Sequence, residues 1–187
     1  MAVTEWQKNL PMRITMSRIF MVPLVVGAMY PDKLSWNIVA AVLFMLASIT
    51  DYFDGYYARK YGAVSNFGKF MDPIADKILV TSILAMLLAL GKIDAWMVII
   101  ILARDNFIGG IRSVAAADQI IIDAKPAGKW KTAMQMVAIP IVIIGNIDQY
   151  VPYLDKVGYG VLWVSVILSI TSGIEYYYGY MKSKKRS

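Results

Sequence analysis

The chain has 187 residues, of which 58% are hydrophobic and 17% charged, and its formal net charge is +6. Soluble domains are typically about 45–50% apolar and about 25% charged, so this composition indicates a protein in contact with lipid and excludes a disordered chain. The sequence contains no Cys and no His, which excludes disulfides, thiol or imidazole catalysis and the usual zinc sites. Any metal ion must therefore be bound through oxygen.

Six apolar stretches are long enough to be membrane-spanning helices, which need about 20 mostly apolar residues. In chain order they are residues 14–30, 36–58, 70–90, 93–113, 131–148 and 157–180. Turn-forming residues separate them, such as Pro31 between the first two and Pro152 before the last. We therefore predict an all-α integral membrane protein with six transmembrane helices in a single domain, residues 1–187.

The segment before the first stretch, Thr4 to Met12, contains Trp6. It fits a short interfacial helix with Trp6 at the depth of the lipid head groups, and it fits a frayed terminus equally well. Arg13 and Arg18 lie where a cleavable signal peptide would be apolar, so we expect no such peptide.

The distribution of Lys and Arg predicts the orientation of the helices. With six spans both termini lie on one side, and only Lys33, Lys92 and Lys156, of 19 Lys and Arg residues, fall on the other. We therefore expect both termini in the cytoplasm and the chain in the cell (inner) membrane. The basic residues 182–186 are then explained by topology and contact with anionic lipid rather than by binding to nucleic acid.

Four aspartates lie within or beside the second and third spans, where ionisable residues are rare and usually mark a functional site. Asp51 and Asp54 are three residues apart, and Asp72 and Asp76 are four apart, so each pair lies on one helical face. If the two helices pack face to face, the four carboxylates meet near the cytoplasmic side. Divalent cations such as Mg²⁺, Mn²⁺ or Ca²⁺ would remove their repulsion, and two ions about 3.5–4 Å apart fit such a cluster. The alternative is that they form helix caps and ion pairs.

Small residues accompany these carboxylates, namely Gly55, Ala58 and Gly68. They allow close approach of a ligand, and they also fit ordinary helix packing in membranes. Arg59 ends the helical stripe formed by Asp51, Asp54, Gly55 and Ala58, in position to pair with a phosphate or a carboxylate.

The run from Asp51 to Asp76 resembles the signature of the CDP-alcohol phosphotransferase family, which fixes eight positions over 26 residues. The matching residues are Asp51, Asp54, Gly55, Ala58, Arg59, Gly68, Asp72 and Asp76. The resemblance implies an enzyme that transfers a phosphatidyl group from CDP-diacylglycerol to an alcohol, releases CMP, uses Mg²⁺ or Mn²⁺ and forms a homodimer.

The resemblance also implies roles for individual residues. Asp51, Asp54, Asp72 and Asp76 are then metal ligands, and Asp76 is in addition the general base. Contacts to the CDP part of the substrate are implied for Thr15, Ser17, Gly55, Arg59, Ser65 and Gly68.

Cations on either side of the link between the fourth and fifth spans suit an acceptor that carries its own phosphate. They are Arg104, Arg112, Lys129 and Lys131. The alternative is that they anchor the helices at the cytoplasmic interface. Residues 11–18, 103–107 and 128–132 are most similar to the phosphatidylglycerophosphate synthases of the family, which implies sn-glycerol 3-phosphate as acceptor and these four cations as ligands of its phosphate.

Other acceptors remain open, in particular inositol phosphate and phosphatidylglycerol. A function of another class, a small cation carrier with carboxylates in its spans, is disfavoured. The sequence shows neither an inverted repeat nor a second polar cluster that would complete a path across the membrane.

Overall fold

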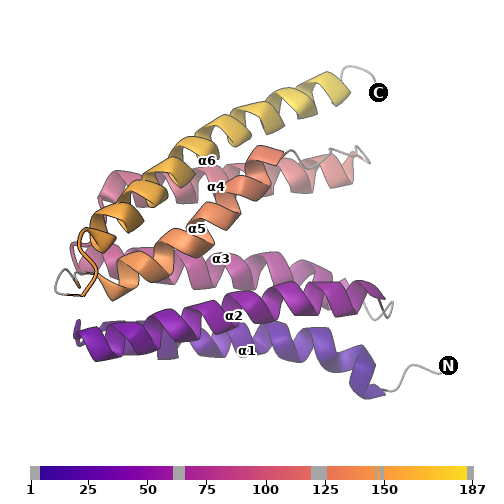
Figure 1. The fold of residues 1–187 in the computed structure, drawn as a ribbon. Coiled ribbons are helices and arrows are strands. Elements are labelled where there is room, and N and C mark those ends of the chain that lie inside the picture. Colours follow the sequence, from indigo (N-terminus) through magenta and orange to yellow (C-terminus); the bar gives the residue numbers. More distant parts are fainter. Residues whose placement is uncertain (1–4, 61–65, 119–125, 146, 148–149, 185–187) are drawn as a thin grey trace.

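The structure, a computed structural model, describes residues 5–60, 66–118, 126–145, 147 and 150–184, but not the side chains of residues 5–15, 51–60, 66–73 and 76. Within these residues it contains helices and no strands (Figure 1). The helices are α1 (Glu5–Met29), α2 (Leu34–Lys60), α3 (Asn66–Ala89), α4 (Ala95–Ala117), α5 (Pro126–Ile144) and α6 (Leu154–Lys184). The prediction of an all-α chain is confirmed, and each predicted span overlaps one helix.

The N-terminal segment differs from the prediction. Helix α1 begins at Glu5 and continues to Met29, so the segment is neither a separate interfacial helix nor a frayed end from Glu5 onward. Figure 1 shows the beginning of α1 turned away from the axis of the rest of the helix. Pro11 explains such a bend, because it lacks an N–H and its ring crowds the preceding turn.

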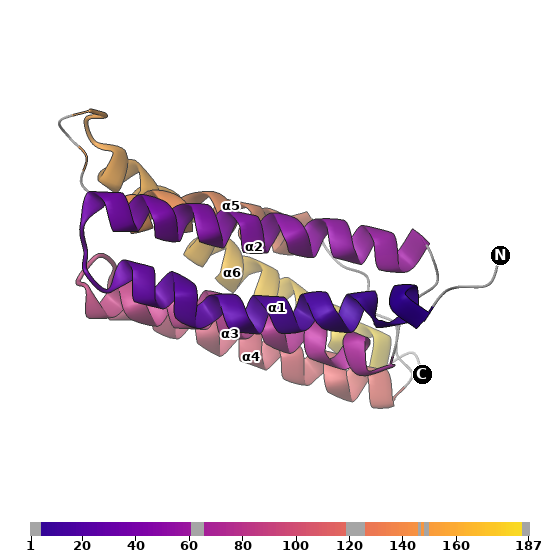
Figure 2. The same ribbon diagram turned by 90° about the horizontal axis from the view of Figure 1, so that it is seen from below.

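The helices run alternately up and down, which gives the bundle two distinct ends (Figure 2). The turns after α1, α3 and α5 lie at one end, which we call the hairpin end. The starts of α1, α3 and α5 and the ends of α2, α4 and α6 lie at the other, which we call the terminal end. Both ends of the described chain are thus on the same side, as an even number of alternating helices requires.

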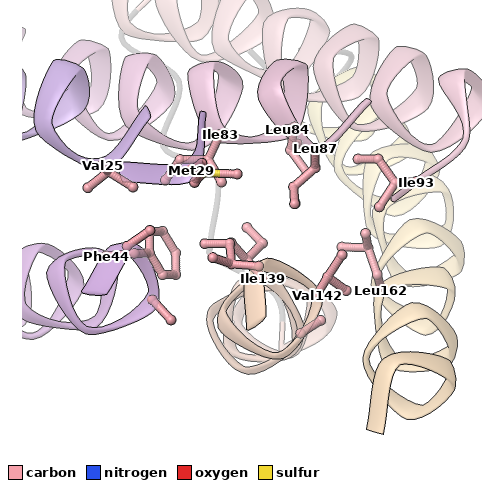
Figure 3. Packing of buried hydrophobic residues seen from close by; sticks show 14 of the residues in the cluster. Val25, Met29, Phe44, Ile83, Leu84, Leu87, Ile93, Ile139, Val142 and Leu162 are labelled. Atoms are coloured by element: carbon pink, nitrogen blue, oxygen red, sulfur yellow. The ribbon is translucent and has the colours of Figure 1, made fainter. Parts of the chain in front are cut away.

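The helices pack as a closed ring in the order α1, α2, α5, α6, α4, α3 and back to α1. Side chains from the ring fill its interior, where Phe44, Ile83, Ile139 and Leu162 are at most 1% exposed (Figure 3). Over their described lengths α2 and α3 both flank α1, and their inward faces line this common core. Close packing of these side chains, rather than pairing of α2 with α3 along their length, holds the two helices in place.

The outside of the bundle is apolar as well. Large side chains such as Phe20, Ile99, Phe107, Ile167 and Ile174 are all more than half exposed. Helices that are apolar on their outer as well as their inner faces are typical of proteins surrounded by lipid.

By length and composition, one described helix is able to cross a membrane on its own, the 31-residue α6. Shorter apolar runs occur in three other helices, at Met16–Met29, Leu34–Thr50 and Lys77–Ala89. The helical count therefore agrees with the prediction of six spans, while the crossing of the membrane by all six stays a prediction.

The hairpin end is held together by Lys92, in the turn between α3 and α4. Its ammonium lies 2.5 Å from the carboxylate of Asp32, after α1, and donates to the backbone oxygen of Ile143, near the end of α5, at 3.1 Å. The Nδ2 of Asn37 on α2 also donates to Asp32, and the hydrogen bonds from these two side chains lower the pKa of that carboxyl below its ordinary value. Gly145 ends α5 with φ of +73°, a conformation that glycine adopts without strain. One lysine thus joins the turns of three helical hairpins.

Candidate functional site

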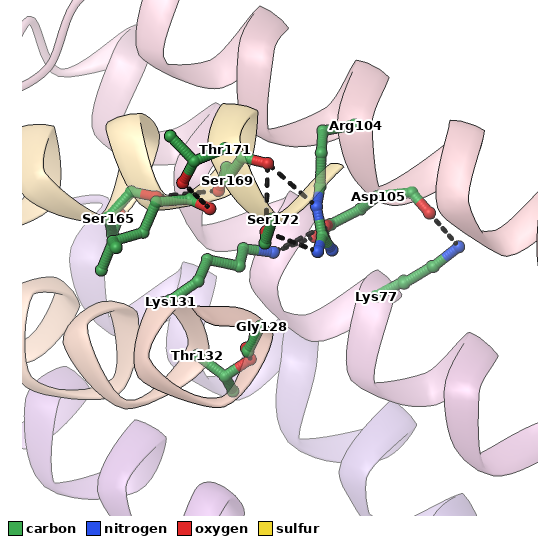
Figure 4. Close-up of polar contacts among 11 residues, drawn as sticks. Lys77, Arg104, Asp105, Gly128, Lys131, Thr132, Ser165, Ser169, Thr171 and Ser172 are labelled. Atoms are coloured by element: carbon green, nitrogen blue, oxygen red, sulfur yellow. Dashed lines mark hydrogen bonds and ion pairs between the residues drawn. The ribbon is translucent and has the colours of Figure 1, made fainter. Parts of the chain in front are cut away.

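Three helices of the bundle meet around Asp105, near the middle of α4 (Figure 4). The ammonium of Lys131 on α5 lies 2.5 Å from Oδ1 and 2.7 Å from Oδ2 of its carboxylate. Arg104 donates from Nη1 to Oδ1 at 3.0 Å, and Lys77 on α3 donates to the backbone oxygen of Asp105 at 2.9 Å. One acidic residue therefore brings together cationic side chains from α3, α4 and α5.

Arg104 is also fixed by α6, which packs against α4. Its Nε donates to the backbone oxygen of Ser169 at 3.3 Å, and its Nη2 donates to the Oγ of Ser172 at 2.8 Å. A Cβ at Gly173 would lie 3.2 Å from the Cγ of Arg104, so the absence of a side chain there gives the arginine its room. The guanidinium is thus held by α6 while it holds Asp105.

Burial makes this cluster electrostatically strong. Lys131 is only 4% exposed, and a buried ammonium requires an anionic or strongly polar partner. The desolvation of this buried ammonium and of the partly buried Asp105 carboxylate offsets much of their attraction, so such a pair positions charge more than it stabilises the fold. The main effect of the cluster is therefore to fix the positions of the cationic side chains, and its contribution to the stability of the fold is small.

A cavity of about 80 Å³ lies beside the cluster, between side chains of α1 to α5. Among the described residues, its charged lining consists of Arg18, Lys77, Lys131 and Asp105. Its uncharged polar lining consists of Ser48, Thr81, Asn106, Thr132 and Gln135. Positive side chains thus outnumber negative ones in the described lining, which favours a small anion with several hydrogen-bond acceptors, such as a phosphate.

Comparison with known proteins identifies the family of the chain. The family model described as CDP-alcohol phosphatidyltransferase matches residues 8–171. The chain belongs to this family.

Curated relatives cover nearly the whole chain. A protein of Rickettsia felis is 41% identical over 170 residues, which are 91% of this chain and 94% of the relative. A protein of Bacillus subtilis is 37% identical, over 90% of this chain and 93% of the relative, and one of Arabidopsis thaliana is 35% identical, over 90% and 78%. The first two are named CDP-diacylglycerol–glycerol-3-phosphate 3-phosphatidyltransferase, and the plant protein carries the same name with the number 2.

The family domain contains all four cations that the sequence assigned to an acceptor phosphate, and the structure brings two of them together. Arg104 and Lys131 meet at Asp105. Arg112 lies two turns further along α4, with its guanidinium 5.5 Å from the centre of the Tyr176 ring. Lys129 is exposed in the first turn of α5, and of the four cations only Lys131 lines the cavity, while Arg104 reaches it through Asp105. The four cations therefore divide into an inner and an outer pair.

The signature residues lie at the terminal end, on the last turns of α2 and the first turns of α3. Most of the predicted metal and nucleotide ligands have side chains outside the described residues: Thr15, Asp51, Asp54, Gly55, Arg59, Gly68, Asp72 and Asp76. Ser65 belongs to a segment that is outside the description altogether, and Ser17 is exposed on α1. Among the side chains that are described, no three acidic residues lie close enough together to hold a metal ion.

Sequence reasoning missed several residues of the cavity. It did not identify Lys77 or Gln135 as site residues, and it gave Arg18 no role in binding a ligand. A signal for Gln135 was present, because it follows Lys131 by four residues in an otherwise apolar stretch and so shares its helical face. The serines of α6 that anchor Arg104 gave no comparable signal, since serine is common in membrane helices.

Proposed function

We propose that this chain transfers the phosphatidyl group of CDP-diacylglycerol to sn-glycerol 3-phosphate, forming phosphatidylglycerophosphate and CMP. The observation that carries the proposal is the buried cationic cavity around Lys131 and Asp105, inside a domain whose curated relatives are named for this reaction. A cavity rich in positive charge suits an acceptor that brings its own phosphate.

The buried cores of α2 and α3 support a carboxylate cluster beside this cavity. Phe44 and Ala47 of α2 are buried, and residues seven positions later on a helix lie on nearly the same face. Those positions are Asp51 and Asp54. Because Phe44 and Ala47 face the core, we expect the side chains of both aspartates to face the interior of the bundle as well.

The same seven-residue spacing relates buried residues to aspartates on α3, except that here the aspartates precede the buried residues. Leu79 and Ile83 are buried, and the residues seven positions earlier are Asp72 and Asp76. Ser48 on α2 and Lys77 on α3 line the cavity, so it lies next to both aspartate stretches. We propose that the four carboxylates face one another here.

A set of four aspartates fits Mg²⁺ or Mn²⁺, which prefer hard oxygen ligands, and two ions suit four carboxylates. When bound, the metal would stabilise negative charge on the departing CMP phosphate and polarise the phosphorus under attack. Asp76 accepts the proton of the acceptor hydroxyl, whose oxygen forms the new bond to the β-phosphorus of CDP-diacylglycerol as the bond to CMP breaks. The chain has no His or Cys to serve as an intermediate nucleophile, in agreement with direct attack.

We assign the remaining residues by position. Thr15, Ser17, Gly55, Arg59, Ser65 and Gly68 contact the CDP portion of the donor. Lys131 and Arg104 bind the phosphate of the acceptor. While no acceptor is bound, both form ion pairs with Asp105. Arg112 and Lys129, which are exposed near the terminal end, attract the anion toward the cavity.

We further propose that residues 1–187 form one domain whose six helices all cross the cell membrane, with the terminal end in the cytoplasm, and that two copies form a homodimer. The exposed apolar side chains and the positions of Lys and Arg support the membrane placement. Because the chain has no Cys, single-cysteine variants at Lys184 and Lys156 can be labelled selectively in sealed vesicles. Reaction of both with an impermeant maleimide from the same side would contradict this topology.

The function is tested with purified protein in detergent, CDP-diacylglycerol and a panel of acceptors. We expect CMP release with glycerol 3-phosphate and Mg²⁺ or Mn²⁺, and none after chelation by EDTA. Inositol phosphate, serine and phosphatidylglycerol complete the panel. Faster CMP release with any of these than with glycerol 3-phosphate would overturn the assignment of the acceptor.

A further inference from the structure

Gln135 is one of several polar side chains in the cavity that the reaction as described so far does not use. Gln135 is 5% exposed, and its Nε2 is buried without a hydrogen-bond partner in the described part of the chain. A buried donor without a partner is unfavourable, because its hydrogen bond to water is lost and not replaced. In a cavity with an excess of positive charge, such a donor is in position to be satisfied by a bound ligand.

The position of Gln135 relates it to the acceptor rather than to the lipid. It lines the same cavity as Lys131 and Asp105, and it lies one helical turn after Lys131 on the same face of α5. Because α5 starts at the terminal end, Gln135 is deeper in the bundle by about 6 Å, at about 1.5 Å per residue. A small molecule whose phosphate is bound by Lys131 would extend past this amide.

We propose that Gln135 is a specificity-determining residue that donates a hydrogen bond from Nε2 to the middle hydroxyl of the acceptor, the one on the carbon next to the phosphate-bearing carbon. This inference rests on the proposed function, because it requires glycerol 3-phosphate as acceptor. The far hydroxyl, which attacks the donor, points toward Asp76, and the middle hydroxyl takes no part in bond formation. The amide therefore selects a polyol phosphate over a simple alkyl phosphate without entering the chemistry.

The test compares two acceptors that differ only in the middle hydroxyl, glycerol 3-phosphate and 3-hydroxypropyl phosphate. A site built to bind a hydroxyl discriminates against an analogue that lacks it, because the buried polar group is then left without a partner. For one neutral hydrogen bond we expect the wild type to prefer glycerol 3-phosphate in kcat/KM by about tenfold. In Gln135→Met, which keeps the length of the side chain but has no donor, this preference should fall to about twofold or less.

A second variant separates recognition from structure. Gln135→Glu keeps the shape of the side chain but places a negative charge beside the phosphate, so we expect a raised KM for glycerol 3-phosphate with an unchanged KM for CDP-diacylglycerol. As a matched control, Asn37→Leu removes another buried amide, at the hairpin end, where the side chain is 3% exposed. It should leave the preference between the two acceptors at the wild-type value.

The possible outcomes distinguish a failure of this inference from a failure of the proposed function on which it rests. If the wild type releases no CMP with glycerol 3-phosphate, the proposed function fails. If the wild type is active but Gln135→Met keeps both its KM and its preference between the acceptors, the role of Gln135 is overturned while the function stands.

Discussion

The two ends of the bundle use the same chemical groups in different ways. At the hairpin end Lys92 pairs with Asp32, and the cavity of about 510 Å³ beside them has a described lining in which Asp32 and Asp155 balance Lys92 and Lys156. Toward the terminal end the cavity is smaller, about 80 Å³, but its described lining has three cations to one carboxylate. The larger cavity is electrically balanced, and the smaller one is not.

This difference is the reason why we propose the site from its charge rather than from its volume. The partners of Lys92 are Asp32, in a turn, and the backbone oxygen of Ile143, near a helix end, so that lysine joins elements of the fold. Lys131 instead lies on a cavity wall with further cations, and an excess of buried positive charge is stabilised by a bound anion. The hairpin end is expected to serve stability, and the terminal end to serve catalysis.

The comparison is tested most strongly by replacing aspartates at the two ends. Asp76→Asn should lower kcat at least about 100-fold, because a general base contributes about 10²–10⁴ to the rate. Asp32→Asn, the matched change at the hairpin end, should leave kcat of the folded protein unchanged. CMP release under saturating substrates measures both, and substantial activity in Asp76→Asn would refute the assignment of the base.

The two lysines give the next largest contrast. Lys131→Gln should reduce kcat/KM for glycerol 3-phosphate about 10–100-fold, because a hydrogen bond to a charged group is worth about 1.5–3 kcal/mol. The KM for CDP-diacylglycerol should change little. Lys92→Gln should leave kcat/KM of the folded fraction unchanged, and steady-state kinetics with either substrate varied distinguish the two cases. Equal kinetic losses in both variants would remove the distinction between the ends.

The smallest effect concerns stability. Lys92→Gln removes the ion pair with Asp32 and the hydrogen bond to the Ile143 carbonyl, so we expect the Tm in detergent to fall by roughly 3–10 °C. Lys156→Gln is the control, because Lys156 is exposed and its ammonium lies 4.9 Å from the centre of the Tyr153 ring. It should shift the Tm by less than about 2 °C. An unchanged Tm in Lys92→Gln would show that this lysine does not hold the hairpin end together.

Much of the fold could be predicted because its determinants are local. The lengths of the apolar stretches predicted the helices, and residues such as Pro31 and Pro152 marked the turns. The predicted ends of the helices were less accurate, because the point at which a helix stops depends on the backbone conformation of a single residue. The predicted fifth stretch reached residue 148, whereas α5 stops at Ile144, where Gly145 adopts a left-handed conformation.

The candidate site could be predicted only in part. The aspartate signature lies within two consecutive helices, so its spacing was visible in the sequence. Lys131 and Ser172 are 26 and 68 residues away from their partners Asp105 and Arg104, and no local pattern indicates such pairs. The separation of Arg112 from the inner cations likewise depends on Tyr176, which lies on another helix.

The sequence by itself determined the helical class, the number of helices and the family signature, because helix formation and carboxylate spacing depend on residues a few positions apart. Only the tertiary structure decided that α1 lies between α2 and α3, that Asp105 holds two of the four candidate cations, and that Gln135 faces the same cavity. These features arise from packing between helices distant in the chain, where burial and charge are set by neighbours that the order of residues does not reveal.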